Sequence, residues 1–138
     1  MATSQGVQNR RRSREIALQV LYSLSQGNAS YDQTFDTYVH EPPLVLAYAL
    51  KLIQGVQLHQ DAILAEVGAH TQNWGIDRIA VVDRVILSIA VFEMKYGKPP
   101  IKTAIAANEA VELAKEFGGA ESGSFVNGVL RGIGGVGD

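Results

Sequence analysis

Apolar residues recur at helical spacing along most of the 138-residue chain. The first stripe lies between residues 13 and 25 and consists of Ile16, Ala17, Val20, Leu21 and Leu24. A stripe of this width is typical of an amphipathic helix that buries one side. Ser13 is a candidate N-cap for this helix, because a serine hydroxyl can bind a free backbone N–H. Gly27 is a candidate stop, because glycine adopts a left-handed backbone at low cost.

The polar segment that follows, residues 28–41, is expected to be a loop that holds one short helix. Four further helices are predicted by apolar spacing, over about residues 42–67, 76–96, 102–117 and 122–133, and the second of them starts as a short turn of helix from Ile76 that leads into a stronger helix. The first of these would bend near Gly55, and Ser122 is a candidate cap for the last. No stretch alternates with period two for long enough to predict a strand. The predicted fold is therefore all-α, with six or seven helices.

The composition narrows the class of protein. Apolar residues make up 46% of the chain and charged residues 19%, which is too apolar for a disordered segment. The longest apolar runs are far shorter than the roughly 20 residues of a membrane span. The chain has no cysteine, which excludes disulfides, thiolate metal sites and a cysteine nucleophile. Since no apolar stretch follows the first basic residues, no secretory signal is expected, and a cytoplasmic location is predicted.

The net charge of −2 conceals an uneven distribution. Residues 1–14 carry four arginines and no acid, whereas the other 124 residues carry 8 lysines and arginines against 14 acids. The four arginines are Arg10, Arg11, Arg12 and Arg14. At the start of the predicted helix a cation gains nothing from the helix dipole, whereas a bound phosphate would. Local helix energetics therefore do not account for the arginines.

Phosphate binding is one explanation, because planar guanidinium groups bind phosphate through two parallel hydrogen bonds. Gln19 and Tyr22 continue the same polar face of the helix. A tyrosine there would stack on an unpaired base while Gln19 contacts a base edge, a combination found in single-stranded RNA recognition. The alternatives are a solvated basic tail, or a surface for an acidic protein or an anionic lipid.

Motifs for catalysis or metal binding are not found in the sequence. His40, His59 and His70 are too far apart to share a metal at the usual ligand spacing. Residues 132–137 spell G-x-G-x-x-G, but the dinucleotide fingerprint follows a strand and opens a helix. Glu109, Glu112 and Glu116 have the spacing of a solvated helix face. We therefore expect no enzymatic activity, no cofactor and no metal.

Four segments of the chain stand out together: RRRSREIALQVLY (10–22), VDRVILSIAVFEM (82–94), NEAVELAKEFG (108–118) and FVNGVL (125–130). In their order and spacing they resemble the NusB family of bacterial transcription antitermination factors. The resemblance spans about residues 10–133 as a single domain, with residues 1–9 as a flexible tail and residues 134–138 as a glycine-rich tail. It implies two packed helical bundles and no enzymatic activity.

The resemblance also implies a function. Proteins of this family bind the boxA element of ribosomal RNA leader transcripts, as a heterodimer with the small-subunit ribosomal protein NusE. The complex joins other Nus factors on RNA polymerase, which then reads through terminators. No membrane partner is implied.

Site residues follow from the resemblance by position. The arginine-rich start matches Arg10, Arg11, Arg12 and Arg14, expected on phosphates, and the tyrosine of the first helix matches Tyr22, expected against a base.

Four positions in the rest of the chain match as well. Glu121, Ser124 and Phe125 match positions that border the RNA, although Phe125 also opens an apolar stripe and would suit the core. Asp83 matches an acidic position near the NusE interface, or is a helix-start carboxylate favoured by the dipole. Asn127 and Gly128 are expected to serve packing.

Two local departures and two alternative functions accompany the resemblance. Residues 101–107 are about two residues longer than usual in the family, and Ser124 stands where a basic residue is frequent. One alternative is a helical adaptor or homodimer without RNA binding. The other is the NusB-like domain of a ribosomal RNA methyltransferase, which requires a long C-terminal catalytic domain after residue 138.

Overall fold

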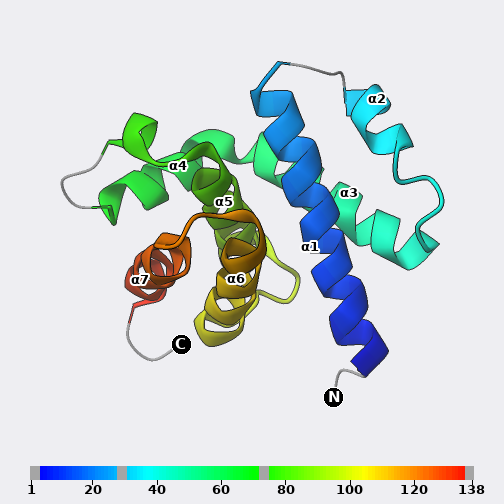
Figure 1. Cartoon of the computed structure of the whole chain (residues 1–138). Coiled ribbons are helices and arrows are strands. Elements are labelled where there is room, and N and C mark those ends of the chain that lie inside the picture. The colour runs from blue at the N-terminus through cyan, green and yellow to red at the C-terminus, as the bar shows by residue number, and fades with distance from the viewer. Residues whose placement is uncertain (1–3, 28–30, 72–74, 136–138) are drawn as a thin grey trace. The chain divides into compact units, whose positions relative to one another are not determined.

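The computed structural model describes residues 4–27, 31–71 and 75–135, with only the backbone for residues 31–33. Within these ranges it contains seven α-helices, one short 3-10 helix and no strand (Figure 1). In chain order they are α1 (Ser4–Ser25), α2 (Tyr31–Asp36), α3 (Pro43–Leu58), α4 (Gln60–Ala69), η1 (Ile76–Arg78), α5 (Val81–Tyr96), α6 (Thr103–Phe117) and α7 (Ser122–Gly134). The predicted all-α fold is confirmed.

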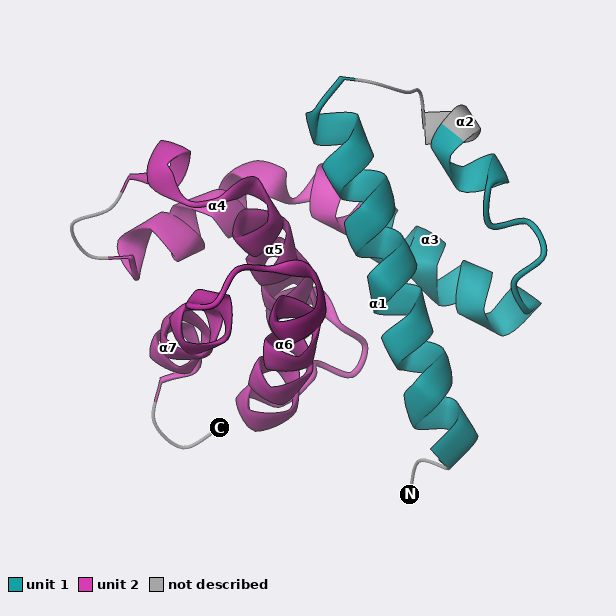
Figure 2. Ribbon diagram, viewed as in Figure 1, with its two compact units in different colours: residues 1–54 teal, residues 55–138 magenta. Residues whose placement is uncertain are grey.

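The chain divides into two compact units, residues 1–54 and residues 55–138 (Figure 2). The first unit holds α1, α2 and most of α3. The second holds the last turn of α3 together with α4, η1, α5, α6 and α7. The candidate site residues are therefore described within the unit to which each belongs.

Helix α1 begins nine residues earlier than its predicted start. Ser13 is not an N-cap, because it lies inside α1 and is buried. Its Oγ lies 2.9 Å from the carbonyl oxygen of Asn9 and 2.8 Å from that of Val45 in α3. The hydroxyl thus bonds back along its own helix and across to α3 instead of capping. Residues 4–9, predicted as a flexible tail, form the first turns of α1.

The rest of α1 follows the predicted pattern. Ile16, Ala17 and Val20 are fully buried, as the apolar stripe indicates. The helix ends before Gly27, whose φ of +71° is the left-handed conformation expected of a glycine stop.

The helix predicted over residues 42–67 is two helices. The break lies at His59, between α3 and α4, and not at Gly55. Gly55 has a packing role instead, because a Cβ placed there would lie 2.2 Å from the ring of Phe92. His59 stacks on Tyr96, with ring centroids 3.8 Å apart and planes at 11°. Phe92 and Tyr96 of α5 thus pack against the end of α3 and the break at His59.

Helix α5 is the central helix of the second unit. Its residues from Val85 to Met94 are all buried, because α4, α6 and α7 pack against it. The buried face of α6 consists mainly of alanines, which lets α7 approach closely. A Cβ on Gly134 of α7 would lie only 2.0 Å from the Thr103 hydroxyl of α6. This close packing holds α7, and with it Glu121, Ser124 and Phe125.

Candidate nucleic-acid interface

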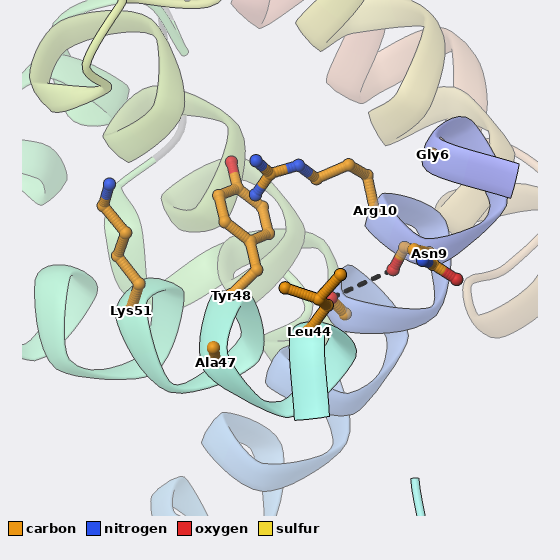
Figure 3. Close-up of a pocket in the computed structure, with 8 residues that line it drawn as sticks. Gly6, Asn9, Arg10, Leu44, Ala47, Tyr48 and Lys51 are labelled. Carbon is orange, nitrogen blue, oxygen red and sulfur yellow. Dashed lines mark hydrogen bonds between the residues drawn. The ribbon is translucent and has the colours of Figure 1, made fainter. Parts of the chain in front are cut away.

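Arg10 and Arg11 are both exposed in the middle of α1. They do not lie at the helix start, so the predicted location of the arginines at the positive end of the dipole is wrong. The Cζ of Arg10 lies 3.5 Å from the centroid of the Tyr48 ring in α3 (Figure 3). A guanidinium that stacks on an aromatic face in this way is held in position, and its N–H groups remain available at its edges.

Arg12 is held by two carboxylates. Its Nη2 lies 2.8 Å from Oε2 of Glu41, and its Nη1 lies 3.1 Å from Oε1 of Glu15. The hydrogen bond with Glu41 raises the pKa of Arg12 above its ordinary value, although desolvation opposes it. The same hydrogen bond lowers the pKa of Glu41. The positive charge of Arg12 is therefore largely compensated within the first unit.

Arg14 differs from its neighbours because only 6% of it is exposed. It lies one turn after Arg10, where α1 enters the apolar core beside Ile16 and Ala17. Arg14 thus contributes to the packing of the first unit and presents little surface to a ligand. The four arginines of the sequence prediction therefore occupy three environments: exposed, ion-paired and buried.

Tyr22 and Gln19 lie further along α1. Tyr22 is 38% exposed and offers part of its ring to solvent. Gln19 is half-buried, and its Oε1 accepts a hydrogen bond from the hydroxyl of Tyr38. Burial raises the pKa of Tyr38, so this hydroxyl keeps its proton at neutral pH. Arg11 and Tyr22 are eleven residues apart, which in an α-helix places them on nearly the same face, about 16 Å from each other.

The remaining predicted RNA residues lie at the start of α7 in the second unit. Glu121 occupies the N-cap position without a side-chain cap, and both Glu121 and Ser124 are exposed. Ser122 is the first residue of α7 and not its cap, since its Oγ accepts a hydrogen bond from the N–H of Gly119 at 2.9 Å. Phe125 is half-buried, whereas the next residue, Val126, is fully buried. Part of the Phe125 ring therefore remains accessible.

Asn127 and Gly128 are more open than the sequence suggests. Gly128 is exposed, and a Cβ added to it would meet nothing within 4 Å. Asn127 is only half-buried, and its Oδ1 accepts a hydrogen bond of 3.4 Å from Nε of Arg131. The expectation that both serve packing is therefore wrong.

Asp83 lies in the first turn of α5 with 8% of its surface exposed. Its Oδ1 is buried and has no hydrogen-bond partner among the residues that the structure describes. A buried carboxylate oxygen without a donor is costly, so a partner that supplies a donor would be favoured. The position also fits a first-turn carboxylate stabilised by the helix dipole.

Three further residues of the first unit are not among the site residues predicted from the sequence: Glu41, Tyr48 and Lys51. Tyr48 and Lys51 lie one helical turn apart in α3 and line a pocket with Arg10 (Figure 3). Glu41 precedes α3 and pairs with Arg12. The sequence holds only a weak signal for them, because periodicity does not reveal which polar residues of one helix meet those of another.

Metal-binding and membrane-spanning features are absent from the described ranges. No cluster of three or more potential metal ligands occurs among residues 4–27, 31–71 and 75–135. None of the helices in these ranges has both the length and the apolar character needed to cross a bilayer.

The NusB family model matches residues 11–134, which is most of the chain. The chain belongs to the NusB family. It is 43% identical over 127 residues to the transcription antitermination protein NusB of Bdellovibrio bacteriovorus, covering 91% of this chain and 94% of that protein. The NusB of Bacillus subtilis is 39% identical over 124 residues, covering 90% of this chain and 93% of that protein.

Solved NusB structures have the same fold. Thermotoga maritima NusB superposes with a TM-score of 0.80 at 27% identity, covering 97% of this chain and 92% of that one. A chain from a complex of antitermination factors NusB and NusE with double-stranded RNA gives a TM-score of 0.80 at 24% identity, covering 92% of this chain and 96% of that chain. Because this identity is low, the similarity to that complex supports the fold alone. The predicted family is thus confirmed by sequence, and the fold by structure.

Proposed function

We propose that this chain is a transcription antitermination factor that binds boxA-type single-stranded RNA of ribosomal RNA leader transcripts together with NusE. It would act in the cytoplasm, on RNA polymerase and with other Nus factors. The observation that carries the proposal is that Arg10, Arg11 and Tyr22 of α1 are exposed in a chain of the NusB family. The NusB relatives named above are covered over more than nine tenths of their length, which favours this function over a methyltransferase domain.

In the proposed complex Arg10 and Arg11 bind phosphates and Tyr22 stacks on an unpaired base. The Gln19 carbonyl is engaged by Tyr38, which leaves the amide N–H groups of Gln19 to donate to a base. Arg12 is ion-paired and Arg14 is buried, so we assign their charges mainly to folding. Two phosphate contacts instead of four predict a slope of log K against log[salt] near −1.4 and not near −2.8.

The second unit supplies a second group of RNA contacts in this proposal. Glu121 and Ser124 are exposed, and the accessible part of the Phe125 ring offers a stacking surface. A serine at position 124 donates one hydrogen bond and carries no charge, so it adds specificity and not electrostatic attraction.

NusE has two roles in the proposal. Outside residues 1–14 the chain carries a net charge of −6, from 8 lysines and arginines against 14 acids, which disfavours RNA binding over most of its surface. A basic ribosomal protein would supply the missing positive charge. Asp83, whose Oδ1 lacks a donor, is the proposed position for a hydrogen bond from NusE.

The proposal is tested by measuring RNA affinity by fluorescence anisotropy. Labelled boxA-like and scrambled oligonucleotides are each titrated with and without NusE. We expect tighter binding of the boxA-like RNA, and a further gain with NusE. Equal affinity for both RNAs in the presence of NusE would contradict sequence-specific recognition. Complete absence of RNA binding, with NusE still bound, would instead favour the helical adaptor.

The role of Asp83 is tested separately by NusE affinity. Asp83→Ala removes the proposed acceptor and is expected to weaken NusE binding by about tenfold, as for a hydrogen bond with a charged partner. Glu112→Ala, at an exposed position of α6, is the matched control because it also removes one carboxylate. Equal NusE affinity for the two variants would exclude Asp83 from the interface.

A further inference from the structure

The first unit contains a pocket of about 370 Å³ between α1 and α3 (Figure 3). We propose that this pocket binds one nucleotide of the RNA strand, with its phosphate between Arg10 and Lys51. The inference rests on the proposed function and extends the RNA surface from α1 onto α3. Lys51, Tyr48 and Leu44 belong to neither the arginine-rich segment nor the other predicted RNA contacts.

The charge of the pocket is the first argument. Arg10 and Lys51 are its two charged lining residues, and no acid is among the described residues that line it. Lys51 is exposed and forms no hydrogen bond or ion pair within the described part of the chain. The pocket thus carries two uncompensated cations on a protein whose net charge is −2. A phosphate would compensate them without removing a cation from an existing partner.

The geometry of Arg10 is the second argument. Its guanidinium is stacked on Tyr48, so its orientation is restricted before any ligand arrives. Stacking occupies one face of the guanidinium but leaves the N–H groups at its edge free to bind two phosphate oxygens. An arginine restricted in this way loses less side-chain entropy on binding than a free one. Lys51, one turn after Tyr48 in α3, supplies a more flexible second cation.

The apolar part of the pocket indicates what accompanies the phosphate. Leu44 is 76% exposed, and Ala47 lies beside it in the lining. These side chains offer no hydrogen bonds to a second phosphate but provide contact area for a sugar or a base. Asn9, from α1, adds an amide at the same rim. A nucleotide combines a phosphate with an apolar ring, and therefore matches the pocket better than an inorganic anion does.

Continuity with the proposed RNA face favours RNA over an acidic peptide. Arg10 lines the pocket, and Arg11 is the next residue on α1, exposed as well. In the proposed complex we expect neighbouring phosphates of one strand to bind Arg11 and Arg10. The pocket would then add one nucleotide to the strand that is bound along α1.

The test compares Lys51→Ala with the parent chain in RNA anisotropy titrations from about 0.1 to 1 M salt. Because Arg10 still holds the phosphate, the salt slope should fall by up to about 0.7, which over that range is an affinity loss of up to roughly fivefold at the low-salt end. Lys51→Arg keeps the charge and is expected to retain the slope. Lys115→Ala is the matched control, because it removes one charge from an exposed lysine of α6.

Tyr48 is tested with two variants. Tyr48→Phe keeps the ring under Arg10 and should preserve RNA affinity, whereas Tyr48→Leu removes the stack and should weaken it several-fold. Thermal unfolding of each variant separates this loss from misfolding. Unchanged affinity in Tyr48→Leu would exclude a role in RNA binding for the stacking of Arg10 on Tyr48.

The outcomes distinguish this inference from the proposed function. If Arg11→Ala and Tyr22→Ala weaken RNA binding but Lys51→Ala behaves like Lys115→Ala, the pocket inference is wrong and the proposed function stands. If the parent chain binds no RNA with or without NusE, both are wrong. An equal loss in Lys51→Ala and Lys115→Ala would show a general charge effect and would also overturn the pocket.

Discussion

Arg12 and Glu41 are 29 positions apart in the chain, and Nη2 of Arg12 lies 2.8 Å from Oε2 of Glu41. The pair connects the middle of α1 to the residues that lead into α3. Arg12 is therefore part of the fold of the first unit, although the sequence groups it with the exposed arginines. Its side chain remains 37% exposed, so solvent screens the pair and its contribution to stability is modest.

We expect Glu41→Gln to lower the free energy of unfolding by about 0.5 to 1 kcal/mol, because it removes one partner of a partly exposed, charge-assisted pair. Thermal unfolding followed by circular dichroism would show a decrease in Tm of about 2 to 4 °C. Glu112→Gln is the control, since Glu112 and Lys115 form an exposed pair at 3.5 Å and should contribute almost nothing. Equal Tm values for the two variants would contradict a stabilising role for Glu41.

The stabilisation by Glu41 should depend on pH. Its pKa in the folded state is lowered from about 4.5, so the folded protein favours the charged carboxylate. The contribution is therefore fully present above pH 4.5 and is lost as the pH falls through the lower, folded-state value. In urea titrations, the free energies of unfolding of the parent and of Glu41→Gln should differ at about pH 7 and become equal at about pH 3. A difference in free energy that increased as the pH fell would contradict this mechanism.

RNA affinity should respond to Glu41→Gln in the opposite direction. Without the Glu41 carboxylate, Arg12 keeps its ion pair with Glu15 and its contact with the Tyr38 ring, and its remaining N–H groups become available to a phosphate. We expect tighter RNA binding in low salt, with a slope of log K against log[salt] that is steeper by up to about 0.7. A variant that is both less stable and less able to bind RNA would show that Glu41 supports the RNA surface instead of competing for Arg12.

Tyr22 gives the sharpest test of base stacking. Because Tyr22 is 38% exposed, Tyr22→Ala removes mainly surface contact area. Stacking of a base on an aromatic ring contributes about 1 to 3 kcal/mol, so RNA affinity should fall by roughly 5- to 150-fold. Tyr22→Phe keeps the ring and should bind within about twofold of the parent. A comparable loss in Tyr22→Phe would assign the effect to the hydroxyl and not to stacking.

Two glycines should respond oppositely to alanine. Gly55→Ala places a Cβ 2.2 Å from the buried ring of Phe92, and overpacking of this kind costs about 1 to 3 kcal/mol. Gly128→Ala meets nothing within 4 Å in the middle of α7 and should stabilise by about 0.5 to 1 kcal/mol. Thermal unfolding of both variants measures the change in Tm that each causes. A Gly55→Ala variant as stable as the parent would show that Phe92 moves aside without cost.

Helix content was predictable from the sequence because it depends on local spacing. The stripe from Ile16 to Val20 and the stop at Gly27 are properties of neighbouring residues, and the structure has both. The start of α1 was not predictable, because Ser13 satisfies the local rule for a cap while its hydroxyl is engaged with Val45, 32 positions away.

The candidate site was predictable only in part, for a similar reason. The cluster of arginines is visible in the sequence, but the fate of each depends on residues far along the chain. Glu41 neutralises Arg12, Tyr48 holds Arg10, and the core encloses Arg14. Likewise Gly55 was predicted to be a bend from its sequence context, whereas in the structure it allows close packing of Phe92, which is 37 positions later. Long-range contacts of this kind leave no periodic signal in the sequence.

The early start of α1 has an entropic consequence. If residues 4–12 were an unstructured arm, ordering each residue on RNA would cost about 1 to 2 kcal/mol. In this protein Arg10 and Arg11 already stand on a helical backbone, with their spacing set before an RNA arrives. Their phosphate contacts therefore carry no backbone-ordering cost, whereas the same contacts made from a disordered arm would be weakened by that cost.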